Sequence, residues 1–450
     1  MSLRADLPVT ADFVPEDLST FRDRLSPSWI EEALEATGVA TLRRRRLPAE
    51  LVIWLMIGIA LIRNRRIAEV AAKLDLALPV RSGKVVAAAS IPPARERVGE
   101  EPVRWLFERT GKVWAAEGAN EQRWRGLAIY GIDGTTLRVA DSPDNRATFG
   151  GQTSTLGRGQ SAYPMIRVLG LMALRTHVLA GAAIGGYKTS SELSLAPDLC
   201  AQVPDDSLTI LDRNFLQPKT LVGLNREGVN RHWLTRAKKN TAFRVTQSLG
   251  PGDDLVAMPV SAQARTKDPT LGKTWTARAI RYQRKGFQPQ LLLTSLLDPK
   301  QYPAAEMADM YHERWEIELG YGEIKTDLLC RRESLRSKKS EGVRQEVWGV
   351  LLAYNLVRLE MARIARNVSV PPTRMSFVLC LARICDEWMW TADTVAPGAV
   401  PKHLDEMRDK ILRLVLPPRR PERSYPRAVK IKMSNYLRKR PAETTKDPLK

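Results

Sequence analysis

Residues 127–136 read LAIYGIDGTT, a short apolar run that leads into an aspartate, a glycine and two threonines. An apolar run of this length followed by turn residues is typical of a buried β-strand, so we expect a strand that ends at Asp133. Two longer apolar runs follow, at 165–174 and 177–184, with only two residues between them. This close spacing predicts a β-hairpin.

Helical and extended patterns alternate after the hairpin. We expect strands where short apolar runs occur, and helices where apolar residues recur every three or four positions. Together these segments predict a mixed α/β sheet. In order, they are a helix at 190–200, a strand at 208–211, a helix at 218–226, and strands at 233–236 and 291–295.

A stretch rich in Gly, Pro and polar residues, at 238–289, interrupts that sheet. Within it, alternating polar and apolar residues such as those at 275–281 indicate antiparallel strands. We therefore expect a β-rich insertion within the α/β core.

Two aspartates stand at corresponding places on the predicted strands. Asp133 follows the apolar run at 127–132, and Asp212 follows the run at 208–211. Ligands and catalytic groups of open α/β sheets gather at the carboxyl ends of the strands, so the two carboxylates are candidates for a shared metal site. Aspartates at strand ends are also ordinary turn residues, and either one alone favours that structural interpretation.

A long helix is expected at 304–329, with four polar side chains along one side of it. At about 100° per residue, these four side chains share a stripe roughly 60° wide, which borders a face predicted to be buried. Ion pairs along the border of an amphipathic helix would account for the spacing. Three acids that converge with two bases would instead suit metal-assisted phosphoryl transfer. The stripe consists of Tyr311, Arg314, Glu318 and Lys325.

The composition describes a large, folded and strongly basic chain. It has 450 residues, of which 44% are hydrophobic and 27% charged, and this balance excludes a globally disordered protein. Lys and Arg number 70 against 50 Asp and Glu, which gives a formal net charge of +20. Such an excess predicts an acidic polymer as the partner, most often nucleic acid.

Four cysteines and four histidines are scattered along the chain. Their spacing fits neither a disulfide framework nor a zinc site, so we expect a reducing compartment and carboxylate ligands for any metal. The N-terminal residues do not resemble a secretory signal. The most apolar stretch, at 51–62, has about half the length of a membrane-spanning helix, and we interpret it as a buried helix. These features predict a cytoplasmic protein with no membrane partner.

The region before the α/β core is expected to be helical. Pro92 and Pro93 are expected to break the chain before a helix at 94–108. Four consecutive arginines lie between two earlier helices. They are either a solvated helix end or the phosphate contacts of a DNA-binding domain, and the overall charge favours the second. The four are Arg43, Arg44, Arg45 and Arg46.

The region after the core is expected to contain helices near 345–365 and 376–389. Beyond Pro417 the chain is rich in proline and holds eleven Lys or Arg against three Asp or Glu. A segment of this composition is expected to be an extended tail that attracts phosphates.

The polar stripe of the long helix resembles a known signature. Its four residues match, without a gap, the YREK signature of the insertion-sequence-4 family of bacterial DDE transposases. The LLLTS strand before the helix, the DGTT after the first strand and the LDR at the second aspartate also resemble that family. The resemblance covers about 127–329, and the helical N-terminal region resembles the family's end-binding domain more loosely.

The resemblance implies a ribonuclease-H-like core, with the first acid on the first strand, the second on the fourth strand and the third on a late helix. Asp133, Asp212 and Glu318 would be the catalytic acids and would hold two Mg²⁺ ions, for which Mn²⁺ would be a substitute. Arg314 and Lys325 would clamp DNA phosphates near the cut. By similarity, the enzyme would cut the ends of its element through hairpins and join them to target DNA.

Aromatic residues also gain roles from the resemblance. Tyr311 would hydrogen-bond a phosphate, and Trp315 would either stack on an extruded base or pack beneath the helix. Some members of the family have an aromatic wedge just before the LLLT strand, where this chain has Gln290. Trp275 or Phe287, both in the insertion, would be the substitutes.

The expected fold is therefore a ribonuclease-H-like mixed sheet between helical end regions. The protein is expected to act on double-stranded DNA, as a homodimer that brings two element ends together. Two other functions stay open: another nuclease of the same fold, and a catalytically silent DNA-binding protein derived from a transposase. The expected segments are a helical DNA-binding domain at 1–115, a core at 120–237 and 290–365, the insertion at 238–289, a helical region at 366–416 that is a candidate for dimerisation, and the basic tail at 417–450.

Overall fold

The computed structural model describes residues 25–40, 47–73, 87–152, 161–284, 288–330, 334–394 and 400–417. Three features singled out from the sequence lie outside these residues: the arginines from Arg43 to Arg46, Phe287, and the basic tail beyond Pro417. Within the described ranges, no helix is long and apolar enough to cross a membrane.

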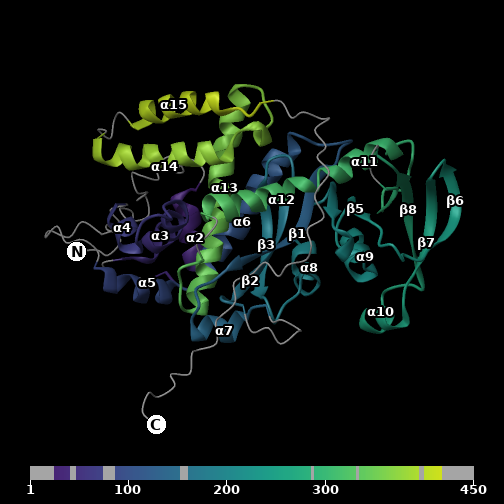
Figure 1. Cartoon of the computed structure of the whole chain (residues 1–450), viewed down its shortest axis with the longest axis horizontal. Helices are drawn as coiled ribbons and strands as arrows, with labels where there is room; N and C mark the ends of the chain where they lie inside the picture. Colours follow the sequence, from purple (N-terminus) through teal and green to yellow (C-terminus); the bar gives the residue numbers. More distant parts are fainter. Residues whose placement is uncertain are drawn as a thin grey trace, which may run out of the picture.

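A nine-stranded sheet forms the centre of the molecule (Figure 1). Its strands stand in the order β3-β2-β1-β4-β5-β9-β8-β7-β6. β1 pairs antiparallel with β2 and parallel with β4, and β4 pairs parallel with β5. The predicted mixed α/β sheet is confirmed, and its first five strands form the ribonuclease-H-like core. These strands are β1 (Ala128–Arg138), β2 (Met165–Ala173), β3 (Val178–Gly186), β4 (Ser207–Leu211) and β5 (Arg231–Arg236).

β1 is longer than the sequence predicted. We expected the strand to end at Asp133, but it continues to Arg138. Its parallel pairing with β4 stops at Ile132, whereas its antiparallel pairing with β2 continues to Arg138. Because one partner strand is enough to hold the backbone extended, the polar DGTT residues do not end it. Asp133 therefore lies in mid-strand, at the level where β4 ends.

The residues after β5 extend the same sheet. β9 pairs antiparallel with β5 on one side and with β8 on the other, and β7 and β6 complete the series. These strands lie at the opposite end of the molecule from the N-terminal helices (Figure 1). The elements are β6 (Arg244–Gly250), β7 (Asp253–Pro259), α10 (Ala262–Lys267), β8 (Thr274–Tyr282) and β9 (Gln290–Thr294).

The chain before the sheet is helical. α3 is buried along its whole length except for one residue, so the apolar stretch at 51–62 is a buried helix, as predicted. The helix expected at 94–108 is instead two helices, because Gly99 has a φ of +67° that ends the first one. Pro92 and Pro93 lie in the first turn of that helix rather than before it. The helices are α2 (Pro27–Ala36), α3 (Ala49–Leu61), α4 (Ile67–Lys73), α5 (Ile91–Val98) and α6 (Glu101–Asn120).

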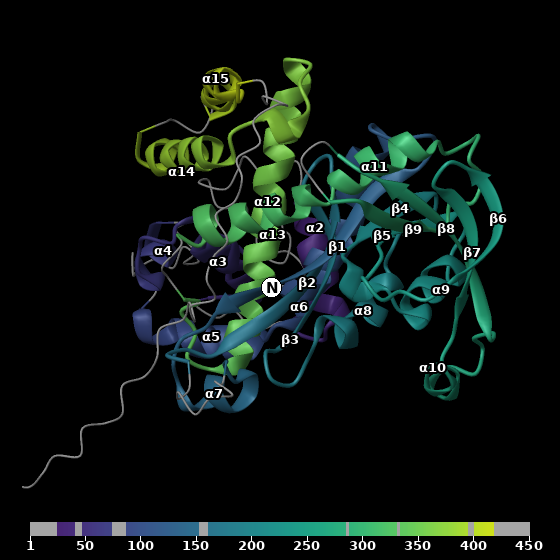
Figure 2. The ribbon, with the colours of Figure 1, turned by 45° about the vertical axis from the view of Figure 1, so that its right-hand side comes forward.

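α13 (Ser340–Asn367) connects the two halves of the molecule. It packs against α3 and α6 and also against β3, and Figure 2 shows it beside the N-terminal helices. α14 (Phe377–Thr394) and α15 (Val400–Ile411) follow it and lie above those helices in Figure 1. The helices predicted near 345–365 and 376–389 are confirmed as parts of α13 and α14.

The long helix expected at 304–329 is divided. A tight turn follows its first part, where the backbone N–H of Arg314 donates to the carbonyl of Tyr311, three residues back. Glu313 and Arg314 keep helical φ and ψ, so the apolar period continues through the turn. The face expected to be buried is buried: Met310, Ile317, Tyr321, Ile324 and Leu328. The three parts are α11 (Ala304–His312), α12 (Trp315–Gly322) and the π-helix η5 (Glu323–Leu328).

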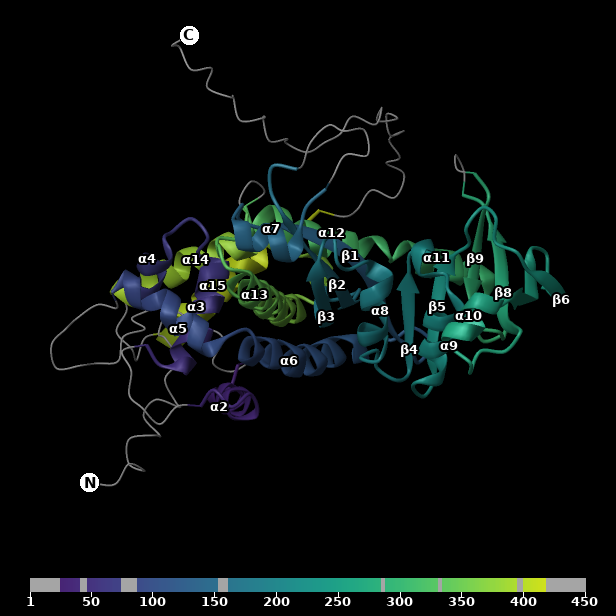
Figure 3. The same ribbon diagram turned by 90° about the horizontal axis from the view of Figure 1, so that it is seen from below.

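α12 lies over one face of β1, and α6 and α8 (Glu192–Cys200) lie on the other side of the sheet (Figure 3). Successive residues of a strand point to opposite faces. Asp133 bonds to Arg314 at the start of α12, whereas a Cβ added to Gly134 would meet Glu192 on α8. α6 lies on the side of the sheet away from α12 (Figure 3). The side chain of Asp133 therefore points into the layer between the sheet and α12.

Candidate active site

Asp133 and Asp212 lie at the same level of the sheet, where the pairing of β1 with β4 ends. In the parallel ladder, Ile132 pairs with Leu211, and each of these residues is followed by one of the two aspartates. Neighbouring strands lie about 4.8 Å apart, so the backbones of the two aspartates are neighbours. Asp212 precedes a short 3₁₀ turn but makes no side-chain capping bond to it. The register thus places the two aspartates that the sequence singled out on neighbouring strands, at the same level.

Arg314 joins Asp133 to Glu318. Its Nη1 atom lies 3.2 Å from Asp133 Oδ2, and its Nη2 atom lies 2.6 Å from Glu318 Oε1. The side chain of Asp133 is 18% exposed and that of Glu318 is 38% exposed, so the contact lies at the edge of the buried layer. One guanidinium therefore holds two acids that come from different elements, through charge-assisted hydrogen bonds.

The carboxyl of Asp133 is the most clearly perturbed member of this group. Burial raises its pKa to about 6, and neighbouring carboxylates act in the same direction. The N–H of Gly134, which donates to Oδ1 at 2.8 Å, and the charge of Arg314 lower the pKa in part. The Tyr321 hydroxyl donates to the backbone carbonyl of Asp133 at 2.6 Å and fixes the strand beneath α12. Asp133 therefore gains a proton on mild acidification.

Tyr311 and Lys325 lie on either side of this contact. Tyr311 is buried, and burial raises the pKa of its hydroxyl, while Arg314 lowers it and Asp212 raises it. Lys325, on η5, donates to Thr135 Oγ1 at 3.2 Å. The polar stripe predicted on the long helix therefore follows β1, with its members next to the aspartates and the threonine.

Trp315 lies on the surface beside the site. It is 43% exposed, and the guanidinium carbon of Arg314 lies 5.4 Å from the centre of its ring. Leu319, one turn later, is 49% exposed. This exposure favours the stacking alternative over packing beneath the helix.

Gln290, at the position of the family's wedge, and Trp275, one of its two candidate substitutes, are engaged elsewhere. Gln290 begins β9 and accepts a hydrogen bond from Arg236 at 3.1 Å. Trp275 is partly buried against Trp233, with ring centroids 5.4 Å apart. Trp275 thus belongs to the packing of the sheet rather than to an exposed wedge.

A buried charged network beneath α12 was not predicted from the sequence. Glu323, the first residue of η5, accepts a hydrogen bond from the Tyr354 hydroxyl at 2.7 Å and pairs with Arg358 at 3.4 Å. His177, in the turn between β2 and β3, lies 3.0 Å from Glu316 and 3.4 Å from Glu323. Burial alone would raise the pKa of Glu323, but Arg358 and His177 hold it at about 2. The network ties α12 and η5 to the sheet and to α13.

The donor set suits a divalent metal ion. Asp133, Asp212 and Glu318 offer carboxylate oxygens, the ligands that Mg²⁺ and Mn²⁺ prefer. Within the described part of the chain, no three His, Cys, Asp or Glu side chains group closely enough to hold a metal ion as they stand. The guanidinium of Arg314 bonds to both Asp133 and Glu318. Metal binding by these acids would therefore require their side chains to rearrange around Arg314.

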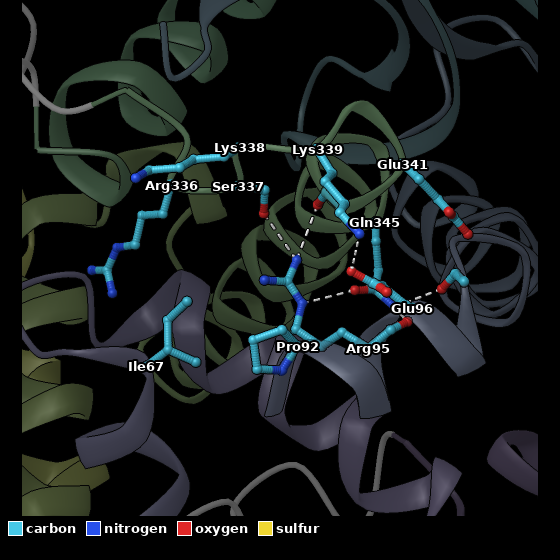
Figure 4. A pocket seen from close by; sticks show the side chains of 12 residues that line it. Ile67, Pro92, Arg95, Glu96, Arg336, Ser337, Lys338, Lys339, Glu341 and Gln345 are labelled. Carbon is cyan, nitrogen blue, oxygen red and sulfur yellow. Dashed lines mark hydrogen bonds and ion pairs between the residues drawn. The ribbon is translucent and has the colours of Figure 1, made fainter. Parts of the chain in front are cut away.

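A pocket of about 270 Å³ lies between α5 and the start of α13, and none of the three acids lines it (Figure 4). Arg95 donates there to Gln345 Oε1 at 2.9 Å and to Ser337 Oγ at 3.0 Å. Lys339 pairs with Glu96 at 2.6 Å. Because Arg95 and Lys339 already have partners, we interpret this pocket as part of the packing interface between the N-terminal helices and α13, rather than as a ligand-binding site.

Comparison with known families and proteins adds independent information. The family described as "Insertion element 4 transposase N-terminal" matches residues 15–108, and the family "Transposase DDE domain" matches residues 124–356. The chain is 37% identical over 432 residues to "Transposase InsG for insertion sequence element IS4" of Escherichia coli (strain K12), which covers 96% of each chain. It is also 37% identical over 234 residues to "Putative transposase InsZ" of the same strain, which covers 52% of this chain and 76% of that protein.

A solved structure, "Cryo-EM structure of piggyBac transposase synaptic complex with hairpin DNA (SNHP)", covers 92% of this chain and 88% of its own. The sequence identity is 13% and the TM-score is 0.43. That likeness is too slight to support a conclusion about this chain.

Proposed function

Because the chain belongs to the insertion sequence 4 family of DDE transposases, we propose that it binds the terminal inverted repeats of its own element, cuts the element ends and joins them to target DNA. Membership of this family makes it an enzyme that cleaves DNA and transfers strands. DDE domains generally use divalent metal ions. The element ends, the hairpin step and the residues of the site are parts of the proposal.

We assign Asp133, Asp212 and Glu318 as the catalytic acids, which would hold two Mg²⁺ ions, with Mn²⁺ as a substitute. When bound, the ions would stabilise charge on the attacking and leaving oxygens of an in-line displacement at phosphorus. Two observations support the assignment: the register that aligns the aspartates, and the guanidinium that reaches both Asp133 and Glu318.

The cations of the site would bind the phosphates. Once Arg314 releases the carboxylates, the parallel N–H donors of its planar guanidinium group can bind two phosphate oxygens near the cut. Lys325, held on η5 against Thr135, would add a compact positive charge further along β1. Because burial raises the pKa of Tyr311, its hydroxyl stays protonated and can donate a hydrogen bond to a phosphate oxygen.

Trp315 would stack on a base that leaves the helix when the ends form hairpins. Its exposed ring beside Arg314 supports this role. Gln290, which is bonded to Arg236, offers no aromatic face. In this chain the stacking would therefore come from α12 rather than from the start of β9.

The remaining segments would take the roles expected from the sequence. The helical region at 1–115, with Arg43, Arg44, Arg45 and Arg46, would bind the element ends, and the tail at 417–450 would attract phosphates. The helical region at 366–416 would contribute to a homodimer, since two ends must be held together. The protein would act on DNA in the bacterial cytoplasm.

One observation supports cleavage over simple DNA binding. The register aligns Asp133 with Asp212, and one guanidinium bonds to both Asp133 and Glu318, in a protein with a net charge of +20. Carboxylates repel phosphate, so a protein that only binds DNA has no use for such a group. The runner-up, a catalytically silent binding protein, is therefore disfavoured. Another nuclease of the same fold would have no need of the Tyr-Arg-Glu-Lys stripe along β1.

The test is to map strand breaks on the DNA that encodes this protein. Purified full-length protein is incubated, with and without Mg²⁺, with its own coding DNA plus several hundred flanking base pairs, and the broken ends are sequenced. Paired, Mg²⁺-dependent breaks at inverted ends are expected. Protection of inverted ends without breaks would favour the silent binding protein, and scattered cuts would favour a general nuclease.

A further inference from the structure

A second pocket opens beside the candidate active site, at the far end of β1. Its volume is about 260 Å³. β1, the start of β2 and the end of η5 form its walls. The lining residues are Thr136, Leu137, Arg138, Tyr163, Met165, Lys325, Thr326 and Leu329.

Two cations line this pocket, and no acid does. Arg138 is exposed, and its guanidinium carbon lies 4.6 Å from the centre of the Tyr163 ring. Lys325 lies on the opposite wall and bonds to Thr135. Among the described residues, neither cation forms an ion pair with a carboxylate. The pocket therefore concentrates positive charge without an internal counter-charge.

The two cations act on each other. Burial lowers the pKa of Lys325, and repulsion by Arg138 lowers it further. An anion between them would relieve this repulsion and would gain two charge-assisted hydrogen bonds. The pocket in Figure 4 is different, because Lys339 is already paired with Glu96 there.

The pocket lies within reach of the same DNA strand as the acids. Arg138 is on the same strand as Asp133, five residues further on, which corresponds to about 16 Å at 3.3 Å per residue. One strand of a DNA duplex advances about 3.4 Å along the helix axis per nucleotide. A DNA strand that is bound at Asp133 and runs over the surface in the direction of β1 would thus bring a phosphate to Arg138 about five nucleotides from the cut.

We propose that Arg138 and Tyr163, together with Lys325, form a second phosphate-binding subsite, which holds the backbone of the DNA strand a few nucleotides from the point of cleavage. This inference rests on the proposed function and adds a contact to it. Tyr163 orients the guanidinium by stacking on it. Arg138 is thus a DNA-binding residue that positions the strand rather than a catalytic one.

Phosphate-ethylation interference tests the subsite. The probe is a duplex of about fifty base pairs that carries one mapped element end, and binding is measured without metal, so that no cleavage is needed. The variant is Arg138→Ala, and Arg138→Gln is a second variant that keeps most of the side chain. Arg244→Ala is the matched control, because Arg244 is an exposed arginine on β6, the edge strand at the far end of the sheet.

Ethylation of one phosphate, a few nucleotides inside or outside the cut, should weaken binding of the wild-type protein but not of the Arg138 variants. The slope of log affinity against log salt should fall in magnitude by about 0.9 in these variants, as expected for one lost phosphate contact. The Arg244 control should keep the wild-type interference pattern.

An unchanged interference pattern in both Arg138 variants would overturn the subsite and leave the proposed function intact. Loss of all end-specific binding by the wild-type protein itself would instead contradict the proposed function. The salt slope could instead fall by the same amount in the Arg138 variants and in the Arg244 control, with every interference position kept. That result would show that Arg138 contributes only general positive charge, and it would also overturn the subsite.

Discussion

Asp133 and Asp212 stand side by side because the residues before them, Ile132 and Leu211, pair in the parallel ladder of β1 and β4. A slip of one residue in that register would turn one carboxylate to the other face of the sheet. The residues of β1 and β4 that precede the two aspartates are buried, and their packing fixes the register. The position of the two acids is therefore a property of the core of the sheet, and substitution of either by asparagine should leave the fold intact.

Asp133 should make the protein less stable as the pH rises from about 4 to about 6. Burial raises the pKa of its carboxyl to about 6 in the folded state, from an ordinary value of 3.8. Between these values the folded state binds more protons than the unfolded state, so ionisation of Asp133 reduces the free energy of unfolding by up to about 3 kcal/mol. Urea unfolding of wild type and Asp133→Asn at pH 4, 5, 6 and 7 measures this. A constant difference between the two proteins over that range would contradict it.

Removal of Arg314 should move the acid limb of the pH–rate profile for DNA cleavage to higher pH. Arg314 lowers the pKa of Asp133, so without it the carboxyl stays protonated to higher pH. At neutral pH, Arg314→Ala should also lose about tenfold to a hundredfold in rate, because a charge-assisted hydrogen bond to phosphate is lost. Arg314→Lys keeps the positive charge but not the planar guanidinium group. The acid limb of its pH–rate profile should shift less than that of Arg314→Ala. An Arg314→Ala profile with an unshifted acid limb would contradict this account.

Glu323→Gln should destabilise the protein strongly. Its partner Arg358 is fully buried, and a buried charge that loses its partner costs about 3–5 kcal/mol. Because the pKa of Glu323 is held at about 2, below its ordinary 4.5, its contribution is present above pH 4.5 and is lost as the pH falls towards 2. Thermal and urea unfolding at neutral pH measure the loss.

The matched control for that substitution is Glu313→Gln. Glu313 pairs with Arg175, but both side chains are about a quarter exposed. The free energy of unfolding should therefore fall by about 1 kcal/mol or less. Equal losses in Glu313→Gln and Glu323→Gln would show that the buried network contributes no more than a surface pair.

Trp315→Ala should impair the hairpin step and leave the stability unchanged. The ring is largely outside the core, so the free energy of unfolding should change by less than about 0.5 kcal/mol. Loss of stacking on an extruded base should cost about 1–3 kcal/mol in the step that needs that base. Single-turnover assays that separate nicked, hairpin and resolved products measure the effect. Leu319→Ala removes an equally exposed residue one turn away, and the same defect in this control would remove the stacking role.

Much of the core could be predicted because its strands are short apolar runs bounded by polar residues. The hairpin of β2 and β3, the helix α9 (Pro218–Arg226) and the strand β4 were each recognised from local pattern. The end of β1 was missed, because pairing with β2 holds the polar residues from Gly134 to Arg138 extended. The sequence around a strand does not indicate how far its partner continues.

The candidate site was only partly predictable. The spacing of Tyr311, Arg314 and Glu318 indicated that they share one face of a helix. The turn between α11 and α12 was not predicted, because the backbone there keeps helical φ and ψ and the apolar spacing is not interrupted. The network around Glu323 was missed because its partners are far away in the sequence. His177 has a φ of +62°, which places its ring under α12, and this depends on the hairpin turn rather than on a motif.

The proposed cleavage depends on Glu318 as one of three catalytic acids. The most direct measurement is single-turnover cleavage of a mapped element end, in Mg²⁺, by wild type, Glu318→Gln and Glu306→Gln, with end binding measured in parallel. Glu306 lies on α11 and pairs with Arg125 at the surface, so it is the matched control. Glu318→Gln should bind the end without cutting it, while Glu306→Gln should do both. Cleavage by Glu318→Gln at the wild-type rate would contradict the account.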